Sequence, residues 1–207
     1  MIREQFADLA AVVAGVNEVR EVSDLGPLAA ESMMCVAFYG VLLSDRRLAI
    51  SLDGTPEDGL TVDEAMDANG EWLAIFRSSD DPTQLLVLTD AFGFQSLFHS
   101  LIGGDIPQLA LGTSARAVAF RRNSAGQGFS PDWPQILGNL ATTDPWASTI
   151  SSDRTSDVST RVMKPFQMLI IRDGVATIGP RTDFVRDPEA DSGVTGCMKM
   201  LRGVSIG

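Results

Sequence analysis

The segment from Leu85 to Phe98 places the strongest constraint on the fold, because an apolar run leads directly into a tight corner. Its sequence is LLVLTDAFGFQSLF. Four consecutive apolar residues followed by turn-forming residues are typical of a strand buried on both faces. Gly93 tolerates a backbone conformation that side chains disfavour, so the chain is expected to bend there and continue in a strand over 96–102. We expect the Asp90 carboxylate to accept hydrogen bonds from backbone amides around this corner, in a structural role.

Further apolar runs, continuous or alternating, predict a chain made mainly of strands. An Asp-Gly pair at 173–174 predicts a type I′ hairpin between two of them. Eight or more strands with few helices indicate an α+β fold that is largely antiparallel. The additional strands are expected over 16–22, 33–43, 48–52, 70–76, 109–114, 166–171 and 175–178.

Helices are expected to be short and few. Apolar residues three and four apart predict an amphipathic helix over 2–14. Thr61 is placed to cap a helix over 62–66, with Glu64 at the third helical position. Shorter helical stretches are expected over 115–120, 136–140 and 197–201, with irregular chain over 121–134 and an exposed loop over 141–160.

Composition excludes several classes of function. The chain has 207 residues, 44% of them hydrophobic, and a net charge of −11, so it is expected to be globular and to avoid nucleic acid. No apolar stretch approaches the roughly 18–20 residues of a membrane span. Cys35 and Cys197 are isolated, which favours a reducing compartment over a disulfide scaffold. A cytoplasmic protein is therefore expected, with Cys35 as a buried thiol.

The order of strands and helix over 70–120 resembles the N-terminal glutaminase-type domain of the asparagine synthetase and β-lactam synthetase family. In that family a strand ending in Asp-x-Phe-Gly is followed by a second strand and then by a Ser-Glu-x-Lys-Ala-Leu-like helix start. The segment 163–170 looks like the family's Pro-Pro-Gly strand near the end of the domain. The matching segments here are Gly70–Phe76, Thr89–Gly93, Ser96–His99 and Thr113–Val118.

The resemblance implies a four-layer αββα sandwich of two mainly antiparallel sheets, as in N-terminal-nucleophile (Ntn) hydrolases. It implies a glutaminase-like domain over 1–190, and over 191–207 the start of a truncated ATP-dependent synthetase domain. In the family, ATP is bound by a Ser-Gly-Gly-x-Asp-Ser phosphate loop of that C-terminal domain, and the sequence stops at Gly207 before this loop. ATP and Mg²⁺ are therefore expected only in the C-terminal domain and not in this chain. The residues that carry the resemblance, called here the fold-signature residues, are Asp90, Phe92, Gly93, Leu97 and Pro165.

The chemistry of the family is not carried over. Its glutaminases use an N-terminal cysteine whose own α-amine is the base, whereas this chain begins Met1-Ile2. Activating Cys35 would require processing at residue 34, and a core position is the preferred interpretation. The family's Asn-Gly-Glu turn would fall at 53–55, where Asp-Gly-Thr lacks the carboxylate that pairs with the amine of glutamine. No catalytic, cofactor-binding or metal-ligating residue is therefore assigned.

Other arrangements of reactive side chains have simpler structural interpretations. A Ser-His-Asp triad would need His99, the single histidine, which is more readily explained as a structural residue of an apolar strand. The acidic pair 80–81 and the glycine pair 103–104 are interpreted as turns. Trp72 is expected in the core. Trp133 and Trp146 are expected in loops, where they either fasten those loops or mark a partner surface.

The leading hypothesis is a non-catalytic glutaminase-like domain of an asparagine synthetase-related protein that forms amides with ATP. Its partner would be the C-terminal synthetase domain or subunit, with a homodimer as a further possibility and no nucleic acid or membrane partner. The alternative is a self-contained binding or assembly module on the same fold, and a third hypothesis is an active hydrolase. The acid and amine substrates cannot be identified from the residues.

Overall fold

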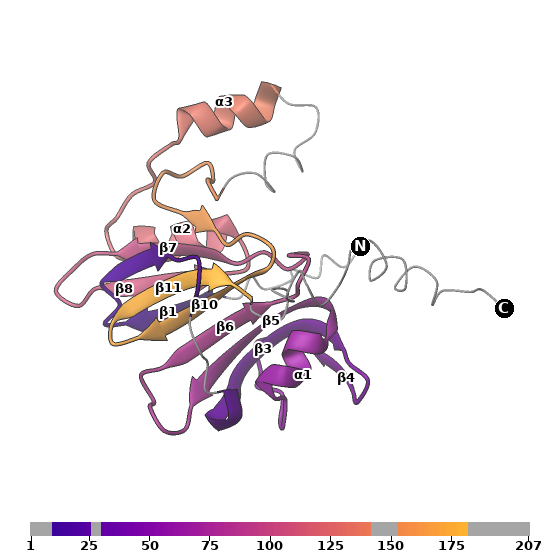
Figure 1. The fold of residues 1–207 in the computed structure, drawn as a ribbon. Helices are drawn as coiled ribbons and strands as arrows, with labels where there is room; N and C mark the ends of the chain where they lie inside the picture. The colour runs from indigo at the N-terminus through magenta and orange to yellow at the C-terminus, as the bar shows by residue number, and fades with distance from the viewer. Residues whose placement is uncertain (1–9, 26–29, 142–152, 182–207) are drawn as a thin grey trace.

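A computed structural model describes residues 10–25, 30–141 and 153–181. The expected domain boundary at 190, the helix over 197–201, Cys197 and Trp146 lie outside these described residues. Over the described part the fold is a mixed α+β structure with two sheets and few helices (Figure 1). No helix in these three ranges is long and apolar enough to cross a membrane.

The larger sheet has seven strands in the order β2-β11-β10-β6-β5-β3-β4. Neighbouring strands are antiparallel except β11 and β2, which pair in parallel. This agrees with the expectation of mainly antiparallel sheets. The strands are β2 (Glu18–Glu21), β3 (Met33–Leu43), β4 (Leu48–Ser51), β5 (Asn69–Ser78), β6 (Leu85–Thr89), β10 (Gln167–Arg172) and β11 (Val175–Pro180).

The smaller sheet has four strands in the order β1-β8-β7-β9, all antiparallel to their neighbours. The chain passes from the smaller sheet to the larger one between β1 and β2, goes back to the smaller sheet between β6 and β7, and returns to the larger sheet between β9 and β10. The β6–β7 connection and the β9–β10 connection are called here the two crossovers, and together they contain the candidate site. The strands are β1 (Ala10–Ala14), β7 (Phe98–Ile102), β8 (Gln108–Gly112) and β9 (Arg161–Val162).

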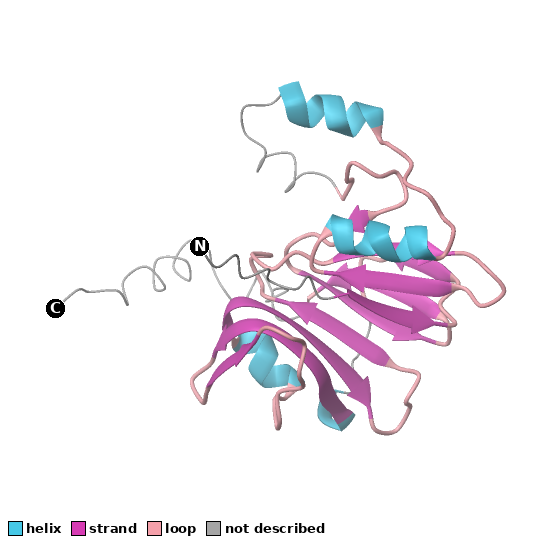
Figure 2. Cartoon of the chain, turned by 180° about the vertical axis from the view of Figure 1, so that it is seen from behind, coloured by secondary structure: helices cyan, strands magenta, loops and turns pink. Residues whose placement is uncertain are grey.

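The helices are short and begin at capping residues that the sequence provides. Thr61 accepts a hydrogen bond from the Glu64 amide at 3.2 Å and starts α1 (Val62–Asp67), as expected. Ser114 caps α2 (Ala115–Ser124) in the same way. The remaining helices are a 3₁₀ turn, η1 (Ala30–Ser32), and α3 (Trp133–Ala141), which stands apart from both sheets (Figures 1 and 2).

Three apolar clusters stack through the molecule. The first lies between α1 and the outer face of the larger sheet, the second between the two sheets, and the third between α2 and the smaller sheet. Burying apolar surface on both sides of a sheet is the main source of stability for such a fold. Representative members are Trp72, Phe38 and Ala65 in the first cluster, Leu73, Leu109 and Leu111 in the second, and Val118 and Ala110 in the third.

Strand β6 confirms the prediction of a strand buried on both faces. Leu86 and Leu88 belong to the cluster on the α1 side, whereas Val87 belongs to the cluster between the sheets. All three side chains are 0% exposed, and each contributes about 2 kcal/mol through burial. The apolar run therefore marks the centre of the larger sheet.

The N-terminal helix prediction is wrong over the part that the structure describes. Residues 10–14 form strand β1, paired along its full length with β8, so that Val12 lies opposite Ala110. A five-residue stretch with two β-branched valines has a weak helical preference of its own. The open edge of β8 decides its conformation, which helical spacing could not reveal.

The described residues between α2 and β10 have more regular and buried structure than expected. Helix α2 continues to Ser124, and Trp133 begins helix α3 rather than lying in a loop. Within the expected exposed loop 141–160, Asp157 and Thr160 are 4% and 0% exposed. Their polar side chains are accommodated because they hydrogen-bond to each other, Thr160 Oγ1 donating to Asp157 Oδ2 at 2.8 Å.

The Asp-Gly hairpin prediction is confirmed. Asp173 and Gly174 have φ angles of 51° and 75°, both positive as a type I′ turn requires, and they join β10 to β11. Trp72 is also in the core as expected, with 0% exposure.

Replacing Gly40 with alanine should destabilise the larger sheet. Gly40 has a φ of 106°, and a Cβ there would lie 2.1 Å from the carbonyl oxygen of Glu71 on the neighbouring strand. Backbone strain and the forced movement of β5 together should cost about 3 kcal/mol or more. Urea unfolding followed by tryptophan fluorescence measures this. Gly138→Ala is the matched control, since open space surrounds Gly138 in α3; equal effects of the two substitutions would contradict the prediction.

Candidate functional site

The corner after β6 is organised by a buried carboxylate. Asp90 is 2% exposed, and its Oδ1 and Oδ2 accept hydrogen bonds from the amides of Phe94 at 3.0 Å and Gln95 at 2.7 Å. The Gly93 amide donates to the Asp90 carbonyl at 3.2 Å, and Gly93 has a φ of 70°. The hydrogen bonds expected for Asp90 are present, and they fix the path of the chain toward the smaller sheet.

The return crossover, residues 163–166, runs beside this corner. The Met163 amide donates to the carbonyl of Leu97 at 2.8 Å, and the Phe166 amide donates to the carbonyl of Ala91 at 3.1 Å. Each crossover therefore satisfies backbone groups of the other, which buried polar groups require. These two of the three places where the described chain changes sheets therefore form one structural unit.

All five fold-signature residues lie in this unit. A Cβ on Gly93 would come within 3.0 Å of Pro165 Cγ, so the glycine permits the close approach of the two crossovers. Phe92 is 57% exposed, and its ring centroid lies 6.0 Å from those of Phe94 and Phe166. The unit presents an aromatic surface, and both carboxylate oxygens of Asp90 already accept hydrogen bonds from the backbone. This arrangement holds the chain in place and leaves no free group to attack a substrate.

Cys35 lies in the interior of β3, at an irregularity in the pairing with β5 between Cys35 and Ala37. The side chain is half-buried and not fully buried as expected, at the border of the cluster on the α1 side. Its Sγ contacts the carbonyl of Ala37 at 3.5 Å, and burial raises the pKa of the thiol. A thiol with a raised pKa is a poor nucleophile at neutral pH.

The turn at 53–55 uses its carboxylate internally. Asp53 Oδ1 accepts hydrogen bonds from the Thr55 hydroxyl at 2.6 Å, the Thr55 amide at 3.0 Å and the Ser51 hydroxyl at 3.1 Å. These bonds hold the pKa of Asp53 below its usual range. The turn is exposed, and its hydrogen-bonding groups are engaged in an Asx turn.

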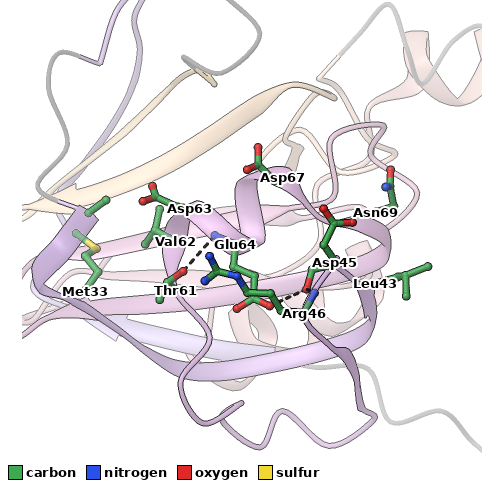
Figure 3. A pocket seen from close by; sticks show the side chains of 12 residues that line it. Met33, Leu43, Asp45, Arg46, Thr61, Val62, Asp63, Glu64, Asp67 and Asn69 are labelled. Atoms are coloured by element: carbon green, nitrogen blue, oxygen red, sulfur yellow. Dashed lines mark hydrogen bonds between the residues drawn. The ribbon is translucent and has the colours of Figure 1, made fainter. Parts of the chain in front are cut away.

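An open cavity of about 860 Å³ lies beside α1 (Figure 3). Glu64, at its base, accepts hydrogen bonds from the Ser44 hydroxyl at 2.6 Å and from Arg47 Nε at 3.0 Å. Asp63 and Asp67 point away from Glu64 (Figure 3), and both are exposed. Paired acid–base chemistry needs carboxylates that converge on one substrate atom, and these do not converge. In the described ranges no group of three or more His, Cys, Asp or Glu side chains could hold a metal ion.

His99 lies on β7 and is 7% exposed. Burial lowers the pKa of the imidazole to about 4; the charge of Asp153 opposes this shift and that of Arg161 adds to it. The adjacent Ser100 points to the other face of the sheet, as neighbours on a strand do, and its hydroxyl donates to the carbonyl of Ser159 at 2.6 Å. These two residues therefore do not form the serine–histidine pair of a triad.

A buried polar network around Asp157 was not expected from the sequence. Arg122 of α2 forms an ion pair with this carboxylate, and the Ser130 amide donates to it at 3.1 Å. Burial alone would raise the pKa of Asp157, but hydrogen bonds from Thr160, Ser130 and Ser159 outweigh that effect and lower it. The serine and threonine two and three residues after Asp157 are a local signal that could have indicated a hydrogen-bonded turn.

Comparison with known proteins gives no family assignment. No protein-family model matches the chain. No curated protein matches it significantly either. Function must therefore be argued from the residues and their geometry.

The Asp90→Asn substitution should destabilise the corner. An amide keeps one acceptor but turns an N–H group toward a backbone amide, leaving a buried donor unsatisfied, at a cost of about 2–3 kcal/mol. Chemical denaturation gives the change in unfolding free energy. Asp105→Asn, in the exposed turn between β7 and β8, is the control and should alter stability by no more than about 0.5 kcal/mol. If Asp90→Asn left the unfolding free energy unchanged, the carboxylate would not be what holds the corner.

Acid should destabilise the protein partly through His99. The folded-state pKa of about 4 lies below the unfolded value of 6.5, so the unfolded chain binds a proton first and stability falls as pH drops from 6.5 through 4. At pH 4.5 the loss from this group should be about 2.5 kcal/mol. Unfolding free energies at pH 7.5 and 4.5 should therefore differ less in His99→Leu than in the native chain. An equal pH dependence in both proteins would contradict the assignment, and carboxylate effects cancel in the comparison.

Proposed function

We propose that the chain is a non-catalytic glutaminase-like domain of an asparagine synthetase-related protein that forms amides with ATP. The observation that carries the proposal is the order of layers: α1, the seven-stranded sheet, the four-stranded sheet and α2. The resemblance implies this αββα order for an Ntn-type domain. The position of the fold-signature residues at the two crossovers supports the same interpretation.

Two local features support the proposal that the chain is non-catalytic. Cys35 is an internal residue of β3, and its nitrogen is part of a peptide bond. An Ntn mechanism needs a free α-amine beside the nucleophile. The turn at 53–55 holds its carboxylate in internal hydrogen bonds, so no glutamine-binding group is proposed there.

The role that remains is a scaffold for the synthetase partner domain. The larger sheet extends beyond the smaller one, and apolar residues on β3, β4 and the turn that follows are 40–61% exposed. We assign this surface to the C-terminal synthetase domain, with a second copy of the chain as the other occupant. ATP and Mg²⁺ belong to that partner domain, the setting is cytoplasmic, and neither nucleic acid nor membrane takes part. The exposed residues are Val41, Leu43, Leu48, Ile50 and Leu52.

One observation favours the alternative, a self-contained binding or assembly module. Trp133, Leu137 and Leu140 lie on one side of α3, at helical spacing, and are 61%, 60% and 78% exposed. Such an apolar stripe on a helix is a common means of protein recognition. The reading frame of the gene separates the two proposals: a Ser-Gly-Gly-x-Asp-Ser loop soon after codon 207 supports the synthetase partner, and a stop codon supports the module.

The chain should not release glutamate from glutamine. Incubation of the purified protein with glutamine, followed by a coupled glutamate assay, should give the same rate as buffer alone. Cys35→Ala should give that same rate. Glutamate release by the native chain that is lost in Cys35→Ala would instead establish an active hydrolase.

A further inference from the structure

A second cavity, of about 650 Å³, lies on the side where the edges of the two sheets meet. Strands β2 and β11 of the larger sheet, β7 and β9 of the smaller sheet and the segment 153–159 all contribute to its wall. Its volume is in the range of small-molecule sites. Neither the corner after β6 nor the turn at 53–55 contributes a wall residue, so this cavity is separate from both of those features.

The imidazole of His99 is part of this wall. His99 lies directly opposite Leu111 in the β7–β8 pairing, and Leu111 belongs to the cluster between the sheets. Residues paired in this way share a face of the sheet, so His99 faces the larger sheet. The described residues provide no hydrogen-bond partner for its ring. A neutral imidazole offers one donor and one acceptor, and the ring nitrogens of His99 are not among the fully buried polar atoms that lack a partner, so a polar ligand in the cavity can reach them.

Two opposite charges flank the histidine. Arg161 Nη1 lies 3.7 Å from Asp153 Oδ2, which is beyond hydrogen-bond distance, and the side chains are 38% and 34% exposed. The backbones of the two residues are fixed relative to each other. The Val162 amide donates to the Asp153 carbonyl at 2.8 Å, and the backbones of Arg154 and Arg161 form an isolated β-bridge. The cavity therefore presents a guanidinium and a carboxylate side by side. The guanidinium can still donate hydrogen bonds to a ligand, and the carboxylate can still accept them.

The charges of the wall balance. Arg20 and Arg161 provide two positive charges, and Glu21 and Asp153 provide two negative ones. A phosphate or other multiply charged anion would meet as much repulsion as attraction in such a site. A ligand that carries both signs of charge can satisfy both sides without leaving either unpaired.

We propose that this cavity binds a small zwitterion with an apolar side chain, an α-amino acid by chemical class. Its carboxylate pairs with Arg161 and its ammonium group with Asp153, while the ring of His99 supplies a further hydrogen bond. The inference does not depend on the proposed function. The apolar part of the ligand lies against Val19, Leu101 and Ile178.

The single histidine makes the site directly observable. The Cε1–H resonance of the imidazole in ¹H–¹³C NMR spectra belongs to His99 alone. L-leucine is the probe, and two analogues each remove one charge: 4-methylpentanoate has no amine and 3-methylbutylamine has no carboxylate. L-leucine should shift the resonance saturably, and each analogue should bind at least about tenfold more weakly, since a lost charge-assisted hydrogen bond is worth about 1.5 kcal/mol or more.

Substitutions then test the two charged residues. Arg161→Lys keeps the charge but loses the fork that pairs with a carboxylate, and Asp153→Asn removes the negative charge at nearly constant size. Each should weaken L-leucine binding at least about tenfold. Arg121→Ala, exposed on α2 on the far face of the smaller sheet, is the matched control and should leave binding unchanged. Native-like spectra of all three variants confirm that the fold is retained.

Three results would overturn the proposal. One is the lack of a saturable shift with L-leucine up to about 50 mM, well above the concentrations that amino-acid sites require. Another is 4-methylpentanoate or 3-methylbutylamine binding as tightly as L-leucine, which would indicate a site for a single charge. The third is unchanged affinity in both Arg161→Lys and Asp153→Asn. None of these three results would bear on the glutaminase-like proposal. That proposal rests on the order of layers and is tested separately by the glutamate assay.

Discussion

The corner that leads from the larger sheet to the smaller one depends on the buried carboxylate of Asp90. A carboxylate without solvent is costly unless its oxygens are hydrogen-bonded, and here both oxygens accept backbone amides. Those amides belong to the segment that leaves the larger sheet for the smaller one. Because the returning chain bonds to the same segment through Leu97 and Ala91, the geometry of one corner sets how the two sheets are joined at two of the three crossovers.

Features encoded by neighbouring residues could be predicted from the sequence. The buried strand β6, the bend at Gly93 and the Asp-Gly hairpin each depend on a few adjacent side chains and backbone preferences, and the structure contains all three. Strand β1 could not be predicted, because its conformation is decided by pairing with β8 nearly a hundred residues later. Local pattern and non-local pairing disagree there, and the pairing determines the outcome.

The same distinction applies to polar groups. Sequence patterns identified Thr61 as a cap and Asp90 as a corner residue, since both bond to amides within five positions. The partners of Asp157 include Arg122, which lies 35 residues away on α2. No local pattern relates these two residues, so a segment rich in serine, threonine and aspartate was interpreted as exposed. The cavity beside His99 has the same origin, because its wall comes from five separate segments.

The residues that hold the sheets together are different from those that an N-terminal thiol mechanism would use. The crossovers depend on Asp90, Gly93 and Pro165, whereas catalysis in a glutaminase depends on the first residue of the chain and on a carboxylate in a turn. The turn at 53–55 contributes to none of the three apolar clusters among the described residues. On the proposed function, the carboxylate of that turn could therefore be lost without disturbing the apolar clusters. The crossover residues could not, because each of them satisfies or permits a contact that joins the two sheets.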